Sequence, residues 1–277
     1  MLDMALDHFK AGRLTEAADC CGKLLNRTPR DFQALHLLGR IRIRQAAFEG
    51  AVFFLSVALG AGSPDQNDTV ATLNDLLSAE LAQRNFDAAI DHAQRALALQ
   101  PGNPVALKAL GNALYGAERF DEAISIYHQV LAAQPNSAAI YNNLGNALRA
   151  SGKLEEAAEA YRRAVTLRPD TAKLHANLGH ALFLLKSSDE AVECYRRAIA
   201  IDPNDGQIRF MLAALLRPRQ QFEEACEHYR HALRFRPDDP EALFGFGAAL
   251  LMLFRCEEAL CPLQRAAALH PSTLSRS

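Results

Sequence analysis

Two short segments decide the fold, because residues 141–148 read YNNLGNAL and residues 175–182 read HANLGHAL. In the first segment the tyrosine, both leucines and the glycine occupy the i, i+3, i+4 and i+7 positions of one helical face. The second segment returns to the same leucine–glycine and alanine–leucine pairs 34 residues later. An amphipathic helix that recurs at a fixed interval indicates a repeat protein.

The 34-residue period extends well beyond these two segments. Proline occurs at positions 101, 135, 169, 203, 237 and 271, tyrosine at 127, 161, 195 and 229, and alanine at 89, 123, 157, 191, 225 and 259. Each copy holds two amphipathic stretches with a break between them, as at Ser151-Gly152-Lys153. The proline ends the second stretch, since a helix interior cannot accommodate its ring. Small residues in both stretches let two helix backbones approach closely.

This pattern resembles the tetratricopeptide repeat (TPR), a 34-residue helix–turn–helix with Leu-Gly in its first helix, Ala and Tyr/Phe in its second, and Pro after it. The resemblance implies an all-α, right-handed superhelical solenoid of about eight copies. It covers residues 1–277 as a single domain, with an inter-repeat insertion at 66–69 and a C-terminal tail at 274–277. The expected copies are 1–31, 32–65, 70–103, 104–137, 138–171, 172–205, 206–239 and 240–273.

The composition excludes several classes of partner. The chain has 30 Lys+Arg against 32 Asp+Glu, a net charge of −2, and therefore lacks the broad basic field that non-specific nucleic-acid binding needs. Its longest apolar stretch, residues 242–254, is shorter than the roughly 20 residues of a membrane-spanning helix. The N-terminal sequence MLDMALD carries acidic residues where a secretion signal has basic ones. We expect a cytoplasmic protein without a nucleic-acid or membrane partner.

No motif for catalysis, cofactor binding or metal binding stands out. The six cysteines form no Cys-x-x-Cys pair, and His228 and His231 lack a third ligand nearby. Paired glutamates such as Glu155-Glu156 recur at the start of the second helix, where negative charge complements the helix dipole. We therefore expect a protein that is not an enzyme and holds no cofactor or metal.

The resemblance also implies a binding surface, because the first helix of each TPR copy lines the inner groove. Asparagine both donates and accepts hydrogen bonds, so it can hold an extended peptide backbone, and lysine and arginine beside it favour carboxylates. We expect a non-catalytic scaffold that binds an extended or acidic segment of a protein partner. The candidate peptide-binding residues are His36, Arg40, Asn74, Lys108, Asn112, Asn142, Asn143, Asn146, Arg149, Lys173, Asn177, His180 and Arg217.

Two finer resemblances bear on the ligand. Lys108, Asn112 and Asn146 match three places of the carboxylate clamp of some TPR adaptors, but Ala176 and His180 stand where that clamp has two cations. Residues 141–148 and 175–182 also resemble the TPR superhelix of O-GlcNAc transferase, in which an asparagine ladder binds the substrate polypeptide. The alternative function is therefore the substrate-recruiting arm of a multidomain glycosyltransferase whose catalytic domain is not in this chain.

The first helix of the last copy is unusually apolar for the end of a solenoid, which normally carries a polar cap. We expect that either more chain follows in a longer protein or this end pairs with another molecule. The candidate residues for self-association are Phe244, Phe246, Leu250, Leu251 and Phe254.

Overall fold

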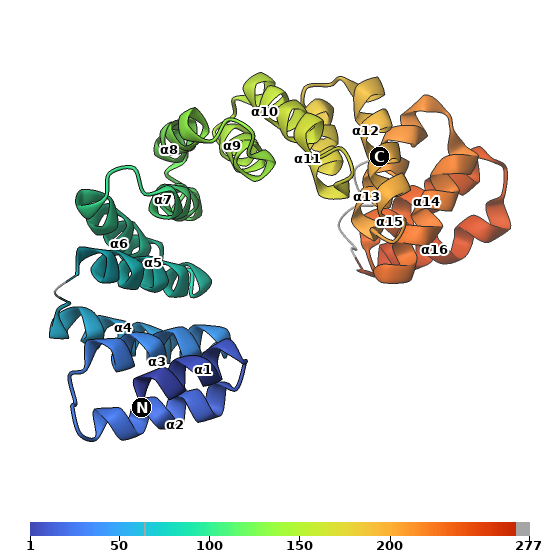
Figure 1. Cartoon of the computed structure of the whole chain (residues 1–277). Coiled ribbons are helices and arrows are strands. Elements are labelled where there is room, and N and C mark those ends of the chain that lie inside the picture. Colours follow the sequence, from blue (N-terminus) through green and yellow to red (C-terminus); the bar gives the residue numbers. More distant parts are fainter. Residues whose placement is uncertain (64, 270–277) are drawn as a thin grey trace. The chain divides into compact units, whose positions relative to one another are not determined.

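The computed structural model describes residues 1–63 and 65–269, and within them the regular secondary structure is sixteen α-helices and one 3-10 turn (Figure 1). This confirms the all-α fold of helix–turn–helix copies. The chain divides into two compact units, Met1–Asn136 and Ser137–Ser277, here called the N-terminal unit and the C-terminal unit. That all 277 residues form one continuous domain stays a prediction.

In the N-terminal unit, consecutive helices pack against each other in pairs, one pair to each copy. The first helices of the copies also contact one another across the pairs. The helices are α1 (Leu2–Lys10), α2 (Leu14–Leu25), α3 (Phe32–Arg44), α4 (Phe48–Ala61), α5 (Gln66–Ala82), α6 (Phe86–Leu99), α7 (Pro104–Gly116) and α8 (Phe120–Ala133).

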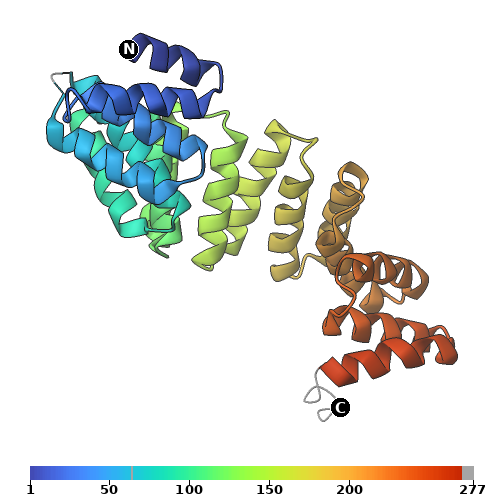
Figure 2. The same cartoon turned by 90° about the horizontal axis from the view of Figure 1, so that it is seen from below.

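The C-terminal unit repeats this arrangement, and Figure 2 shows α9 to α12 side by side. Odd-numbered helices are the first helices of their copies and even-numbered helices the second. The elements are α9 (Ala138–Ala150), α10 (Leu154–Leu167), α11 (Ala172–Leu184), α12 (Ser188–Ile201), α13 (Gly206–Leu216), the 3-10 turn η1 (Arg217–Arg219), α14 (Phe222–Phe235), α15 (Pro240–Met252) and α16 (Cys256–Leu269).

In each copy, one residue in the turn between the two helices adopts the left-handed conformation. Gly12 and Gly152 adopt φ values of 76° and 81°, which glycine tolerates without steric cost. At the equivalent place the other copies have non-glycine residues with φ between 56° and 63°: Ala46, Arg84, Glu118, Lys186, Gln220 and Phe254. The break predicted around Gly152 is therefore a one-residue left-handed turn.

Glycine in the first helix allows the tyrosine of the second helix to pack beneath it. A Cβ atom on Gly111 would lie 2.6 Å from the ring of Tyr127, and one on Gly145 would lie 2.6 Å from Tyr161. Both rings are buried, so neither has room to move away. The close approach that the small residues predicted is present in both units.

The four residues inserted at 66–69 are helical. They form the first turn of α5, which begins at Gln66 and has 17 residues where α7 has 13. The Asp65 carboxylate caps this turn by accepting from the Asn67 N–H at 2.8 Å. The Gln66 side chain donates to the Leu99 carbonyl at 2.8 Å, which ties the added turn to the end of α6.

The structure corrects part of the proposed self-association surface. Leu250 is fully buried in the core with Ala249 and Ala259, because the face of α15 that carries it packs inward. Phe246 is half-buried, whereas Phe244 and Leu251 are about half exposed and Phe254 is 91% exposed at its left-handed turn. Self-association stays a prediction, and residues 270–277, which include the predicted tail, lie outside the described residues.

Candidate peptide-binding surface

In the N-terminal unit, charged side chains join the first helices of two neighbouring copies. The His36 ring on α3 lies 2.8 Å from the Asp75 carboxylate on α5, and the Arg40 guanidinium lies 3.8 Å from the same carboxylate. The Gln33 side chain donates to the Asp68 carboxylate at 2.9 Å. Two predicted residues, His36 and Arg40, thus contact a carboxylate of the next copy. The prediction had these side chains available to a bound peptide.

Between α5 and α7, the described residues have no equivalent of the His36–Asp75 contact. Asn74 stands one copy after His36, and Ala109, which has no polar side chain, stands one copy after Asp75. Within the described residues, the buried amide oxygen of Asn74 has no hydrogen-bond partner. Lys108 is exposed on α7.

In the C-terminal unit, asparagines make the corresponding contacts between the first helices α9 and α11. The Asn177 amide donates to the Asn142 side-chain oxygen at 2.7 Å, and the Asn142 amide lies 3.5 Å from the Asn143 side-chain oxygen. Asn142 occupies the place of His36 in its copy, and Asn177 the place of Asp75. Three predicted residues therefore form one chain of amide groups.

Two other predicted asparagines bond inside their own copy. The Tyr127 hydroxyl donates to the Asn112 side-chain oxygen at 2.9 Å, and the Tyr161 hydroxyl donates to the Asn146 oxygen at 2.7 Å. In each pair the asparagine on the first helix lies over the buried tyrosine of the second. These oxygens have an internal structural role that the peptide-binding prediction did not include.

Three predicted residues, Lys173, Asn177 and His180, line a concavity of about 470 Å³ between α11 and α13. The ring of Tyr195 and the side chain of Met211 also line it. Burial, together with the positive charge of Arg149 nearby, lowers the pKa of His180. His180 is therefore neutral at pH 7, when its ring can both donate and accept a hydrogen bond.

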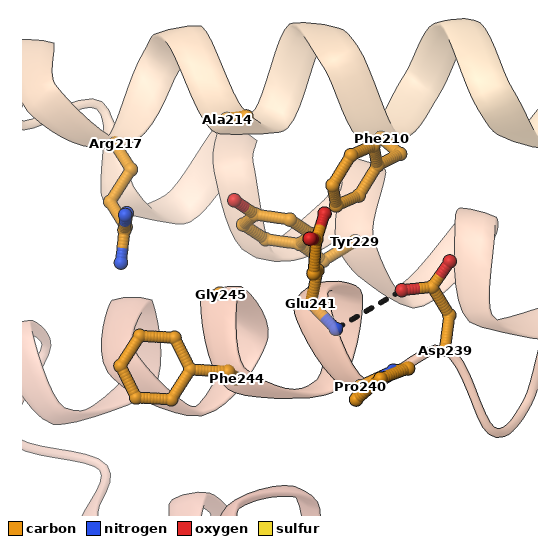
Figure 3. A pocket seen from close by; sticks show the side chains of 9 residues that line it. All are labelled: Phe210, Ala214, Arg217, Tyr229, Asp239, Pro240, Glu241, Phe244 and Gly245. Atoms are coloured by element: carbon orange, nitrogen blue, oxygen red, sulfur yellow. Dashed lines mark hydrogen bonds between the residues drawn. The ribbon is translucent and has the colours of Figure 1, made fainter. Parts of the chain in front are cut away.

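The last predicted residue, Arg217, lines a second concavity of about 710 Å³ between α13 and α15 (Figure 3). Its floor and walls are aromatic, from Phe210, Tyr229 and Phe244. The Phe210 and Tyr229 rings meet edge to face, with their centroids 6.1 Å apart. The two concavities of the C-terminal unit thus differ in chemistry, one lined mainly by polar and charged side chains and one by aromatic rings.

Side chains that could hold a metal ion do not gather in the described part of the chain. Within it, no group of three or more His, Cys, Asp or Glu side chains is placed to bind a metal ion. Burial raises the pKa of the Cys21 and Cys194 thiols to about 11, so both are protonated and unreactive at neutral pH. Among the described helices, none has the length and apolar character that crossing a bilayer requires.

Comparison with protein families identifies the repeat. The model described as tetratricopeptide repeat matches residues 2–66, 108–170 and 142–206, which is more than half of the chain. The chain belongs to the tetratricopeptide repeat family. Further TPR models match residues 70–113, 194–227 and 213–253, so TPR matches reach both units. No curated protein matches the chain.

Solved TPR structures share the fold. The C-terminal part of a TPR repeat-containing protein from Cytophaga hutchinsonii has a TM-score of 0.71 at 14% identity, over 88% of this chain and 99% of that one. The pilF protein of Pseudomonas aeruginosa has a TM-score of 0.66 at 20% identity, over 76% and 95%. YrrB, described as a TPR protein with an unusual peptide-binding site, has a TM-score of 0.59 at 20% identity, over 66% and 94%.

Sequence reasoning missed the partners of the predicted TPR residues. Asp75 was not among the candidates, although it stands one copy before Ala109 and two copies before Asn143 in the repeat register. The tyrosine–asparagine bonds were also missed, although both pairs are 15 residues apart. The O-GlcNAc transferase-like role and the cytoplasmic location stay predictions.

Proposed function

We propose that this TPR chain is a non-catalytic interaction scaffold that binds an extended segment of a partner protein along the first helices of its copies. Membership of the TPR family and the TPR structural neighbours support an interaction scaffold. The observation that carries the finer proposal is the concavity between α11 and α13, where Lys173, Asn177 and His180 lie together.

The chemistry of this concavity suits a peptide backbone. An extended peptide presents alternating N–H donors and C=O acceptors, and each must find a partner when water is displaced. Asn177 donates one N–H to Asn142 and keeps acceptor capacity on its amide oxygen, while neutral His180 offers one donor and one acceptor. The exposed ammonium of Lys173 favours a carboxylate of the bound segment beside it, whereas Asp202 and Asp205, which also line the concavity, disfavour one on their side. Binding of a peptide by the TPR neighbour YrrB is consistent with this use of the fold.

A peptide library tests the proposal because it samples many extended segments at once. Random dodecapeptides are selected by phage display on the immobilised protein, and the affinities of the enriched peptides are measured by fluorescence anisotropy. We expect Lys173→Ala combined with Asn177→Ala to weaken binding at least about tenfold, or about 1.4 kcal/mol.

Arg197→Ala is the matched control, because Arg197 is exposed on the second helix α12 and should not contact the peptide. Thermal melts of the three proteins establish that each is folded. Equal affinity of the wild type and the double variant for every enriched peptide contradicts the proposal.

A further inference from the structure

The buried tyrosines of the repeat differ in what their hydroxyls contact. Tyr127 and Tyr161 each donate to an asparagine 15 residues earlier. For Tyr229 the equivalent residue is Ala214, which has no polar side chain. Tyr229 is 2% exposed as a whole residue and lines the concavity between α13 and α15, and its hydroxyl bonds to no described residue; unlike the hydroxyl of Tyr195, it is not among the fully buried unpaired atoms. The Tyr229 hydroxyl is therefore available to a polar group of a segment bound in that concavity.

The missing asparagine leaves open space over Tyr229. The cavity of about 710 Å³ between α13 and α15 lies beside Ala214, and Figure 3 shows the Tyr229 hydroxyl on the side of the ring that faces Arg217. Gly245 is needed for this arrangement, because a Cβ there would lie 2.5 Å from the Tyr229 hydroxyl. Phe210, Pro240 and Phe244 supply apolar walls, and Phe244 is 48% exposed.

The two ends of the cavity carry opposite charge. Arg217 lies at one end, is only partly exposed, and makes no ion pair within the described residues. At the other end the Asp239 carboxylate accepts from the Glu241 and Ala242 N–H groups at 3.1 and 3.0 Å, so it is the cap of α15. The exposed Glu241 side chain also lies at this end. An anionic ligand group is therefore favoured beside Arg217 and disfavoured beside Glu241.

We propose that this cavity anchors a partner segment with a bulky apolar side chain and a single acidic residue two positions away. The apolar side chain lies against Phe210 and Phe244, while the carboxylate accepts from the Arg217 guanidinium and the Tyr229 hydroxyl. The spacing is two residues because alternate side chains of an extended chain share a face. This inference rests on the proposed function and names the partner side chains that the C-terminal unit recognises.

Labelled nonapeptides test the inference by fluorescence anisotropy. The reference probes contain Ser, Ala and Gly with one central Phe and one Asp two positions before or after it. The comparison probes replace Phe with Ala, Asp with Asn, or Asp with Lys. We expect the tighter reference probe to bind wild-type protein at least about tenfold better than each comparison probe. Tightest binding of the Lys probe overturns the inference, since it means that Glu241 selects the ligand.

Ala214→Asn is the most informative variant because it restores the residue that Asn112 and Asn146 supply in their copies. The introduced amide is expected to bond the Tyr229 hydroxyl and fill the cavity, so the protein keeps its melting temperature but binds the reference probe no better than the Ala probe. Tyr229→Phe, which removes only the hydroxyl, should weaken reference binding less. A folded Ala214→Asn variant with wild-type affinity overturns the inference.

Arg217→Gln distinguishes the contribution of the positive charge to binding from that of the apolar wall. This variant should bind the Asp and Asn probes equally and still prefer Phe over Ala, whereas Arg234→Gln, an exposed control on α14, should behave as wild type. Retained preference for Asp in Arg217→Gln overturns the role given to Arg217. If no reference probe binds but library-selected peptides do, the inference fails and the proposed function stands. If reference binding is lost in Ala214→Asn and unchanged in Lys173→Ala/Asn177→Ala, the cavity binds the reference probe independently of the α11–α13 site, which the library-selected peptides test.

Discussion

The N-terminal and C-terminal units use the same repeat but treat its polar side chains differently. In the N-terminal unit, His36 and Arg40 meet Asp75, and Tyr127 donates to Asn112, a bond that Tyr161 and Asn146 repeat in the first copy of the C-terminal unit. In the C-terminal unit, the asparagine after Asn146 in the repeat register is replaced by His180 and then by Ala214. Concavities lined by Tyr195 and Tyr229 lie beside those two replacements.

In the four copies with a buried tyrosine, the residue 15 positions earlier is asparagine where it accepts from the hydroxyl, and histidine or alanine where a concavity lies beside the ring. Where that position is asparagine, the tyrosine hydroxyl is satisfied and the side chain covers it. Where it is histidine, at His180, the buried hydroxyl of Tyr195 lacks a partner within the described residues; where it is alanine, at Ala214, Tyr229 lines a concavity instead. Because an unpaired buried polar group is unfavourable, a ligand that bonds to the Tyr195 hydroxyl is favoured there.

The largest expected effect comes from filling the space between glycine and tyrosine. Gly111→Ala places a Cβ 2.6 Å from Tyr127, whose hydroxyl is bonded to Asn112. Gly179→Ala places one 3.1 Å from Tyr195, which lines a concavity. Overpacking costs about 1–3 kcal/mol and alanine regains about 1 kcal/mol of helix propensity. Urea unfolding should therefore show a net loss of up to about 2 kcal/mol for Gly111→Ala and a smaller change for Gly179→Ala. Equal losses of unfolding free energy in the two variants would contradict the difference between these two copies.

A smaller effect is expected from removing the hydroxyls themselves. Tyr127→Phe deletes the bond to Asn112, which is expected to lower the free energy of unfolding by about 1 kcal/mol. Tyr229→Phe deletes a hydroxyl without a partner in the described chain, so its unfolding free energy should be unchanged or higher. Thermal and urea unfolding of the two variants measure the contrast, and a larger loss in Tyr229→Phe contradicts it.

The smallest effect is a dependence of stability on pH that both units share. Burial lowers the pKa of His92 in the N-terminal unit and of His180 and His228 in the C-terminal unit. Below the ordinary histidine pKa of about 6.5 the unfolded chain binds more protons than the folded one, so stability falls as the pH falls through this value.

We expect the urea midpoint to decrease between about pH 7.5 and about pH 5.5. Substituting these three histidines with glutamine should flatten that decrease. A midpoint that rises on acidification, or a decrease that the triple variant leaves unchanged, contradicts the assignment.

Much of the fold follows from the sequence because it depends on local chemistry repeated at one interval. Pro169 and Pro203 follow the ends of second helices, and Gly152 supplies the left-handed turn. Periodicity predicts an insertion at 66–69, but the helical state of these residues depends on the Asp65 cap and the contact of Gln66 with α6, which periodicity does not encode.

The candidate site was less predictable, because the repeat register says which helix face a side chain occupies and not what it contacts. Asn112 and Asn177 both lie on first helices, yet one accepts from a tyrosine of its own copy and the other donates to Asn142 of the preceding copy. These choices depend on three-dimensional packing between helices. The aromatic cavity was missed for the same reason, although the alanine at 214 was visible as a departure from the register.

Photo-cross-linking tests the central claim, that the C-terminal unit binds partner segments on its first helices. A library-selected peptide is synthesised with benzophenone side chains at successive positions, irradiated with the protein, and mapped by mass spectrometry of the digested adducts. The account predicts adducts on α11, α13 and α15, at residues such as Met211 and Phe244 that line the two concavities. Adducts confined to the second helices α12, α14 and α16 would contradict it.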